Sequence, residues 1–320
     1  RGASGVTHPL LAEAATQFQA QAFNELLPSS GPVRTIVIGE DTPEKNNQAQ
    51  RVKQFMNYYL TNIMEEYTPD MDQMLFYLPL AGSTFKKTYF DEAMNRVVSK
   101  FVPVENLVVP YETSDLETCP NITQVVRMSL NDLRKNQISG FYRDVEVMPA
   151  QKDLTSVNEE TNRIEGVEPS QIDYDCTLLE CHVDLDLEGY EDMDEDGDPT
   201  GIKVPYVVTL SADNGQVLSI RRNYAEDDEN RKKIQYFTHF KFLPGFGFYG
   251  LGLIHTIGGL SRTATAALRQ LIDAGTLSNL PAGFKARGLR IRDDDDPLQP
   301  GEFRDVDAPG GAIRDSLMPL

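Results

Sequence analysis

The densest group of potential metal ligands in the chain is an acidic run at residues 192–198, which reads DMDEDGD. Asp192, Asp194 and Asp196 alternate as the first three ligands of a calcium-binding EF-hand loop do, and Gly197 falls where such a loop bends. The twelfth position of that loop needs a bidentate Glu, but here it is Lys203. The flanking sequences also predict strands, where an EF-hand has helices. An acidic, solvent-exposed β-turn is therefore favoured, and Asp192, Asp194 and Asp196 stay weak candidates for a cation site.

Known catalytic motifs are absent from the sequence. It contains no phosphate-binding Gly-x-x-x-x-Gly-Lys-Ser/Thr loop, no Gly-x-Ser-x-Gly nucleophile turn and no His-Glu-x-x-His zinc motif. The four histidines are scattered along the chain. Cys176 and Cys181 are five positions apart on one predicted strand, so they point to opposite faces and cannot bridge. We therefore expect no enzyme activity, no cofactor, and reduced thiols as in intracellular proteins.

The charge balance excludes one class of function and leaves another open. The formal net charge is −19, with 49 acidic residues against 30 basic ones. A protein that grips nucleic acid by charge needs Lys and Arg to neutralise phosphates, so that class is disfavoured. The charge balance does not disfavour a protein through which DNA passes without being held. No apolar run approaches the roughly 20 residues of a membrane span, and the opening residues, without Met or a signal peptide, suggest a cleaved or missing N-terminus.

The N-terminal third is predicted to be mostly helical. Apolar residues at steps of three and four predict a helix over residues 10–26, and a β-branched run predicts a short strand at residues 33–38. Thr42, Pro43 and Glu44 form a helix start, followed by an apolar stripe from Val52 to Met64. A similar start at Thr68 predicts a third helix that ends near residue 79.

The middle of the chain is predicted to be largely β. Ser129, with Asp132 three residues on, should cap one short helix at about 130–138, and residues 149–172 are polar enough for an exposed loop. Asn214-Gly215 is a strong hairpin signal between two of the strands. The expected strands are residues 84–90, 96–102, 122–128, 175–187, 204–211, 216–223 and 234–243.

A glycine- and aromatic-rich hinge at residues 244–252 precedes the longest predicted helix, residues 253–279. At 1.5 Å per residue it should span roughly 40 Å. One face carries an apolar seam at heptad-like spacing, formed by Leu253, Ile257, Leu260, Ala264, Ala267 and Leu271. The other face is mainly polar, with Thr256, Arg262, Thr263, Arg269, Gln270 and Asp273. No following helix in the chain could cover the seam, so we expect another part of the protein, another copy or chain not present here to cover it.

A basic segment follows at residues 284–292. On a regular strand, Lys285 and Arg287 would lie on one face, and Arg290 and Arg292 would lie on the opposite face. A β-bulge near Gly288 would bring all four bases to one face. Three uses stay open for this face: a solvated edge strand, a docking strand for another subunit or partner, or contact with DNA.

The order of these parts resembles the portal (head-to-tail connector) proteins of tailed bacteriophages, in particular those of short-tailed phages. The similarity covers roughly residues 45–300 and is most specific over 200–290. The segments that carry it read DEDG at 194–197, VPYVVT at 204–209, NGQVL at 214–218, PGFGFYGLG at 244–252, AALRQLIDA at 266–274 and LSNLPAGF at 277–284.

The resemblance implies an α+β fold in three parts. A mixed wing domain would occupy residues 1–245, helical over 1–80 and largely β over 84–245. A hinge and stem helix would follow at 246–281, and a small β-containing clip at 282–320. The returning stem helix, tunnel loop and crown of such proteins would lie outside this sequence.

The resemblance also implies a function. The protein would form a ring, usually a dodecamer, at one capsid vertex of the virion, after assembly in the host cytoplasm. The seam residues would pack between subunits, the polar face of the helix would line a channel for double-stranded DNA, and Lys285, Arg287, Arg290 and Arg292 would form a docking rim. Its partners would be the major capsid protein, the scaffolding protein, the terminase and a head-tail adaptor, with no membrane involved.

Two other classes of protein compete with this interpretation. The acidic run allows a calcium-stabilised surface or adhesion β-domain. An unidentified hydrolase is the third possibility, although no nucleophile and base can be paired in the sequence. Ring formation separates the portal interpretation from both.

Overall fold

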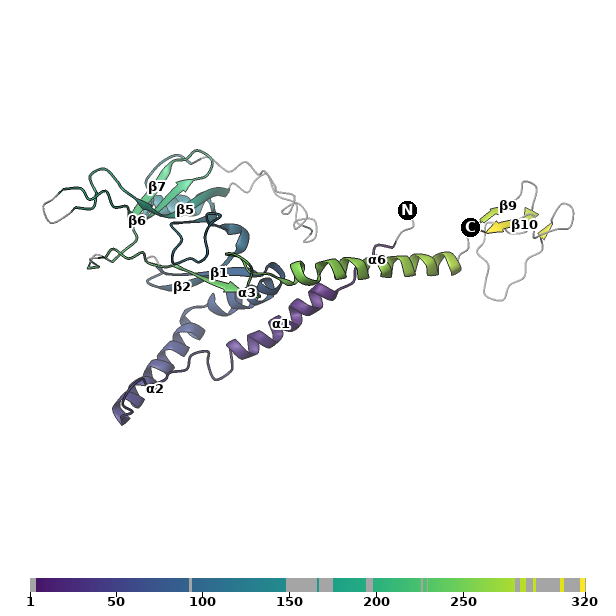
Figure 1. Cartoon of the computed structure of the whole chain (residues 1–320), viewed down its shortest axis with the longest axis horizontal. Coiled ribbons are helices and arrows are strands. Elements are labelled where there is room, and N and C mark those ends of the chain that lie inside the picture. Colours follow the sequence, from purple (N-terminus) through teal and green to yellow (C-terminus); the bar gives the residue numbers. More distant parts are fainter. Residues whose placement is uncertain are drawn as a thin grey trace. The chain divides into compact units, whose positions relative to one another are not determined.

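The computed structural model describes residues 4–91, 94–147, 166, 175–193, 198–225, 227–228 and 230–279, together with four short strands after residue 282. It divides into two compact units (Figure 1). The larger unit is Ala12–Thr256, and the smaller one combines Arg1–Leu11 with Ile257–Leu320.

The described elements mix helices and strands. The helices are α1 (Leu10–Leu26), α2 (Pro43–Tyr58), the π-helix η1 (Tyr59–Ile63), α3 (Tyr67–Ala81), the 3₁₀ turn η2 (Val104–Asn106), α4 (Leu130–Ile138) and α6 (Leu253–Asn279). The strands of the larger unit are β1 (Ser83–Asp91), β2 (Arg96–Pro103), β3 (Leu107–Val108), β4 (Asn121–Ser129), β5 (Asp175–Leu185), β6 (Val204–Ser211), β7 (Val217–Arg222) and β8 (Phe237–Lys241). The smaller unit has β9 (Gly283–Lys285), β10 (Arg290–Ile291), β11 (Val306–Asp307) and β12 (Leu317–Pro319).

Two antiparallel sheets form the frame of the larger unit (Figure 1). The first has the order β2-β1-β8, so the β1–β2 hairpin is joined by a strand from much later in the chain. The second is a five-stranded meander, β3-β4-β5-β6-β7. The α+β class predicted from the sequence is confirmed by this mixture of helices and antiparallel sheets.

Local sequence signals explain most element boundaries. The Thr42 side chain accepts a hydrogen bond from the Lys45 N–H and Pro43 opens α2, as predicted. Ser129 caps α4 by accepting from the Asp132 N–H at 3.1 Å. Two local predictions are wrong: residues 33–38 form no strand among the described residues, because no partner strand lies beside them, and α3 begins one residue before Thr68, without a side-chain cap.

The core lies between and beside the sheets. Phe85 of β1, Val102 of β2 and Ile122 of β4 are fully buried in one cluster with later residues of the chain. A second cluster, around Met74 and Leu75 of α3, is covered by apolar side chains of α1. The helical N-terminal region thus packs on the first sheet through α3.

A buried charged group connects the two sheets. Lys87 of β1 donates to the Glu180 carboxylate of β5 at 2.6 Å, and the His182 ring lies 2.8 Å from the same oxygen. Burial raises the pKa of Glu180, but the His182 hydrogen bond and the Lys87 charge outweigh it and lower the pKa to about 2. Burial lowers the pKa of Lys87, against the pull of Glu180. An ion pair removed from water in this way is costly to break from one side.

The turn before α6 lies against the end of α3. A Cβ added to Gly252 would lie 2.3 Å from the Leu80 carbonyl oxygen, and one added to Gly82 would lie 2.4 Å from the Gly252 nitrogen. Gly82 also has a φ of +86°, which ends α3 in the left-handed region. The Ser83 hydroxyl accepts from the Gly250 N–H at 2.8 Å. Only glycine allows the two backbones to approach this closely.

His239 supports the same turn from β8. Its ring lies 4.5 Å from the Phe85 ring and 4.6 Å from the Phe248 ring, measured between centroids, and its Nε2 lies 3.1 Å from the Ser83 hydroxyl. Burial, with a smaller effect of the nearby Lys241 charge, lowers the pKa of His239 to about 4. The ring is therefore neutral near pH 7 and packs as part of an aromatic cluster.

Gly252→Ala should lower the free energy of unfolding by about 2 kcal/mol, because the new Cβ meets backbone atoms that cannot yield. Gly247→Ala is the matched control in the same turn, since nothing lies within 4 Å of its Cβ and its φ is not positive. That change should stay within about 0.5 kcal/mol. Urea denaturation of the two variants measures the difference, and equal effects would contradict the close approach.

The Glu180 pair predicts a defined loss of stability in acid. Because the pKa of Glu180 falls from 4.5 to about 2 on folding, its contribution is fully present above pH 4.5 and disappears as the pH falls toward 2. The shift corresponds to on the order of 3 kcal/mol. Urea midpoints at pH 7 and pH 3 should therefore differ less in Glu180→Gln than in the unaltered protein. If Glu180→Gln and the unaltered protein lose equal stability in acid, the Glu180 ion pair does not contribute this pH-dependent free energy of unfolding.

Candidate functional site

The sequence-predicted packing seam of α6 is only partly covered in the single chain. Leu253, Ile257 and Ala264 are half-buried. Leu260 and Leu271 are 64% and 70% exposed. Together with the exposed Ala267 they leave an apolar strip along the helix. Leu260, Ala267 and Leu271 follow one another at steps of seven and four, a spacing typical of a helix that packs against another helix.

The segment before α1 covers a different face of α6. The Ser4 N–H donates to the Asp273 carboxylate at 2.8 Å, and the His8 N–H donates to the Thr265 hydroxyl at 3.1 Å. Arg269 donates from Nε to the Val6 carbonyl at 2.7 Å. Arg269 and Asp273, predicted to face a channel, therefore hold residues 4–8 of their own chain.

The other predicted channel residues are exposed. Thr256, Arg262, Thr263 and Gln270 all lie on the surface of α6. Their assignment to a channel wall stays a prediction. The sequence did not predict the contacts between residues 4–8 and α6, because neither segment has a pattern that specifies the other as its partner.

The predicted docking bases fall on two separate short strands. Lys285 belongs to β9, which pairs with β12, and Arg290 belongs to β10, which pairs with β11. Arg287, Arg292 and the predicted bulge at Gly288 lie outside the described residues. The common basic face of these four residues therefore stays a prediction.

The part of the acidic run that the structure describes, Asp192, Met193 and Asp198, belongs to no cluster of potential metal ligands. Asp192 forms an ion pair with Arg231 and accepts a hydrogen bond from the Thr200 hydroxyl at 2.7 Å. Met193 and Pro199 form an isolated antiparallel bridge. Asp194 and Asp196 lie outside the described residues, and no group of three or more potential ligands occurs among those that are described.

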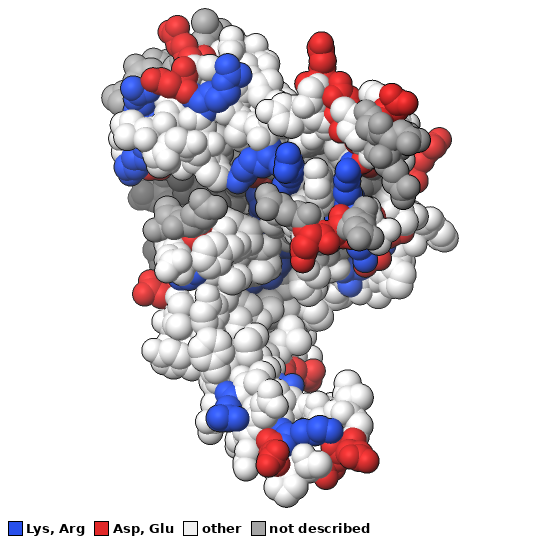
Figure 2. Space-filling model, turned by 90° about the vertical axis from the view of Figure 1, so that its left-hand side faces the viewer, with Lys and Arg blue, Asp and Glu red and all other residues white. Residues whose placement is uncertain are grey.

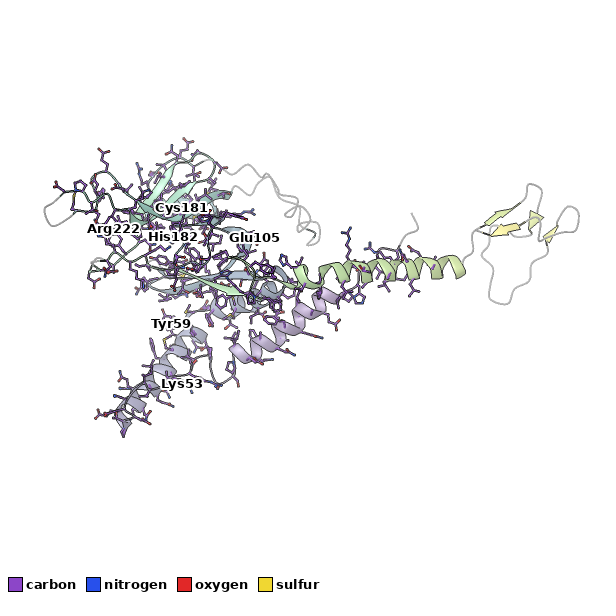
Figure 3. All side chains as sticks on the ribbon, in the orientation of Figure 1. Lys53, Tyr59, Glu105, Cys181, His182 and Arg222 are labelled. Atoms are coloured by element: carbon purple, nitrogen blue, oxygen red, sulfur yellow. The ribbon has the colours of Figure 1, made fainter. Side chains whose placement is uncertain are left out.

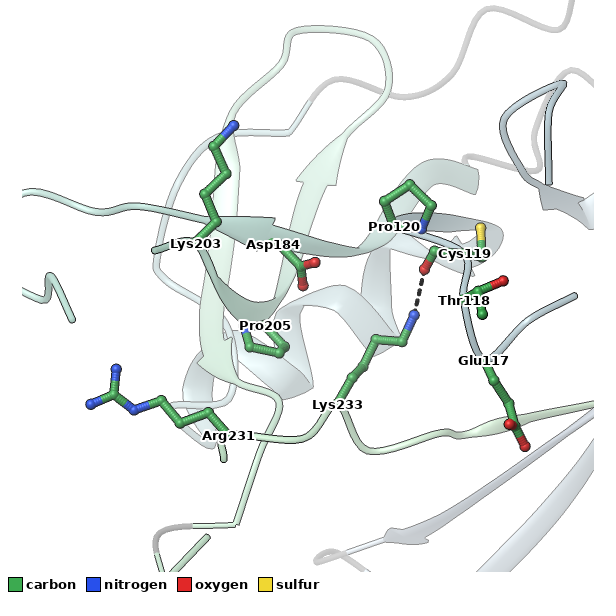
Figure 4. A pocket seen from close by; sticks show the side chains of 9 residues that line it. All are labelled: Glu117, Thr118, Cys119, Pro120, Asp184, Lys203, Pro205, Arg231 and Lys233. Carbon is green, nitrogen blue, oxygen red and sulfur yellow. Dashed lines mark hydrogen bonds between the residues drawn. The ribbon is translucent and has the colours of Figure 1, made fainter. Parts of the chain in front are cut away.

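An open pocket of about 300 Å³ lies beside Cys119 (Figure 4). Its basic side chains include Lys203, Arg231 and Lys233, and Asp184 and Glu117 are also part of the lining. Lys233 donates to the Cys119 carbonyl at 2.5 Å, and Arg231 is paired with Asp192, as described above. The Cys119 thiol donates to the Asn121 carbonyl at 3.0 Å and lies 3.4 Å from the Thr113 hydroxyl. These groups stabilise the loop and do not form a nucleophile–base pair.

The surface combines both charges despite the strong acidity of the chain. Figure 2 shows a group of Lys and Arg side chains in the upper part of the face that it views, with acidic side chains close below it and others toward the edges. Among the described residues, no helix combines the length and apolar content that crossing a membrane requires.

The chain is similar to one known protein family. No curated protein matches the chain significantly. The model of one protein family, described as "Phage SU10 portal protein", matches residues 12–315. The match covers both compact units, including the hinge and α6, and confirms the resemblance to portal proteins of short-tailed phages. The family is structural, and its members are components of the virion capsid. This chain therefore belongs to the family of the phage SU10 portal protein.

Proposed function

We propose that the protein forms a ring at one capsid vertex, which serves as a channel for DNA packaging and ejection. The observation that carries this proposal is the family match over residues 12–315. The exposed apolar strip of α6 supports it. Covering the exposed leucine side chains with a neighbouring helix would stabilise the assembly by about 25 cal/mol per Å² of apolar surface removed from water. A dodecamer is the expected assembly.

The charge of the chain suits a conduit for DNA. Each copy carries a net charge of −19, and a ring multiplies it. DNA phosphates are held by basic surfaces and repelled by acidic ones, so a mainly acidic wall lets the duplex move. The sequence has no phosphate-binding loop for ATP, so the energy for packaging comes from a separate terminase that docks on the ring.

The clip is the proposed docking site for the terminase and the head-tail adaptor. Its four bases are followed directly by Asp293, Asp294, Asp295 and Asp296. Repeated around a ring, such neighbouring opposite charges form a rim whose attraction sets association rate and specificity and weakens with salt.

Leu260→Asp should abolish ring formation and leave the monomer folded, because it places a charge in the apolar strip. Ala266→Asp is the control, since it adds the same charge at an exposed position of α6 outside the strip. Negative-stain microscopy and analytical ultracentrifugation measure assembly, and circular dichroism measures folding. Rings formed by the Leu260→Asp protein would refute the assignment of α6 as a packing helix.

Reversing Arg290 and Arg292 to Glu should weaken docking of the terminase or adaptor, with ring assembly unchanged. Pull-down at low and high salt measures the effect, which should shrink as salt rises. Unchanged docking together with lower affinity for duplex DNA would instead show that these two arginines bind the DNA.

A further inference from the structure

Helix α2 forms an arm that is anchored at one end. It runs into the π-helix η1, where the Tyr59 hydroxyl accepts a hydrogen bond from the Val97 N–H of β2 at 2.9 Å. The Phe55 ring of the arm lies 5.9 Å from the Tyr59 ring, measured between centroids. Figure 3 shows Tyr59 at the base of the arm and Lys53 farther along α2. Contacts with the first sheet therefore fix the arm at its base.

The chain itself covers only one side of the arm. The extended segment at residues 33–38 lies along this side, because the Asn57 side chain accepts from the Val33 N–H at 2.8 Å. The Thr35 hydroxyl donates to the Ala49 carbonyl at 3.1 Å. Ala49 and Asn57 are half-buried as a result, and no residue of α2 is fully buried.

Another side of the arm is an uncovered apolar stripe with a base on each flank. Val52, Phe55 and Met56 are 47%, 60% and 38% exposed, and their spacing places them on one face of the helix. At about 100° of rotation per residue, Arg51 lies on one side of this stripe and Lys53 on the other. Neither base has an ion pair in the described part of the chain. An exposed apolar stripe with polar flanks is typical of a contact surface.

A groove between α1 and α3 has the complementary shape and chemistry. It is open, has a volume of about 280 Å³ and exposes a mainly apolar surface. Its lining consists of one side of α1 and one residue of α3: Thr16, Gln19, Ala20, Phe23, Asn24 and Asp72. The Gln19 side chain donates to the Asp72 carboxylate at 2.7 Å, which holds the acid beside the groove.

The charges of the arm and the groove are opposite. Residues 45–58 of the arm contain three bases and no acid, whereas α1 and α3 together contain four acids and no base. Asp72 lines the groove, and Glu13 precedes Thr16 by about one turn on the same side of α1. Because the chain is acidic as a whole, its copies repel each other except where a basic surface such as the arm meets an acidic one.

We propose that the apolar stripe of the arm docks in the α1–α3 groove of a second copy of this chain, with Arg51 near Asp72 of that copy. The stripe is exposed and the groove is open in the same structure, so they do not meet within one copy. An amphipathic helix in an apolar groove is a common mode of recognition. A contact between two different surfaces of one chain is head-to-tail, and such contacts form rings where the rotation between copies closes.

This interface rests on the proposed ring and can be tested separately from it. In the full chain, Cys181, the one half-buried native thiol, is replaced by Ser, and Phe55→Cys is combined with Ala20→Cys. Each single variant can form at most dimers on oxidation. The double variant should form a ladder beyond the dimer on a non-reducing gel, because each copy links to two different neighbours. Gln50→Cys in place of Phe55→Cys is the matched control and should give no ladder, since Gln50 is exposed on the opposite side of α2.

Charge reversal provides the second half of the test. Arg51→Glu or Asp72→Lys alone should reduce association several-fold, and the two together should restore it. Glu25→Lys is the control, because Glu25 lies on the side of α1 away from the groove. Sedimentation velocity measures association, and the effect of each single reversal should shrink as salt rises.

The outcomes separate the docking from the ring. Rings without a ladder and without charge rescue would overturn the docking and leave the portal function standing. A disulfide formed only within one copy would also overturn it, because the arm would then close on its own groove, and so would an equal ladder with Gln50→Cys. A ladder without rings would support the docking and count against the ring. Neither a ladder nor rings would overturn both.

Discussion

The arrangement of the larger unit depends on a contact between two backbones. The end of α3 and the turn before α6 approach so closely at Gly82 and Gly252 that any side chain there would overlap main-chain atoms. The contact joins residues 170 positions apart (252 − 82). It fixes where the chain leaves the first sheet and where α6 begins.

The buried Lys87–Glu180–His182 group plays a related part between the sheets. Each sheet alone leaves one charge in an apolar layer, which is unfavourable without its partner. The group therefore specifies which strands face each other, because only that arrangement pairs the charges. The group contains a histidine and a carboxylate, as a catalytic triad does, but no serine or cysteine nucleophile. Its hydrogen bonds join residues of the two sheets.

The surfaces left uncovered have one property in common. The apolar strip of α6 and the extended segment at residues 33–38 each lack a neighbour that another copy can supply, a helix for the first and a strand for the second. A strongly acidic chain repels copies of itself, so association requires local apolar and opposite-charge contacts. Membership of a portal family gives these incomplete surfaces a common explanation in a ring.

The sequence by itself determined those features that depend on neighbouring residues. Capping at Thr42 and Ser129, the 253–279 helix and the Asn214-Gly215 hairpin follow from interactions within a few positions, and the order of the parts indicated the family. Only the tertiary structure decided which distant residues meet: the pairing of β8 with β1, the buried Glu180 pair and the hold of Arg269 on residues 6–7. The predicted strand at 33–38 shows the physical reason. Its extended, alternating conformation is local, but a strand exists only where a second one donates and accepts hydrogen bonds, and the sequence of one segment does not specify that partner.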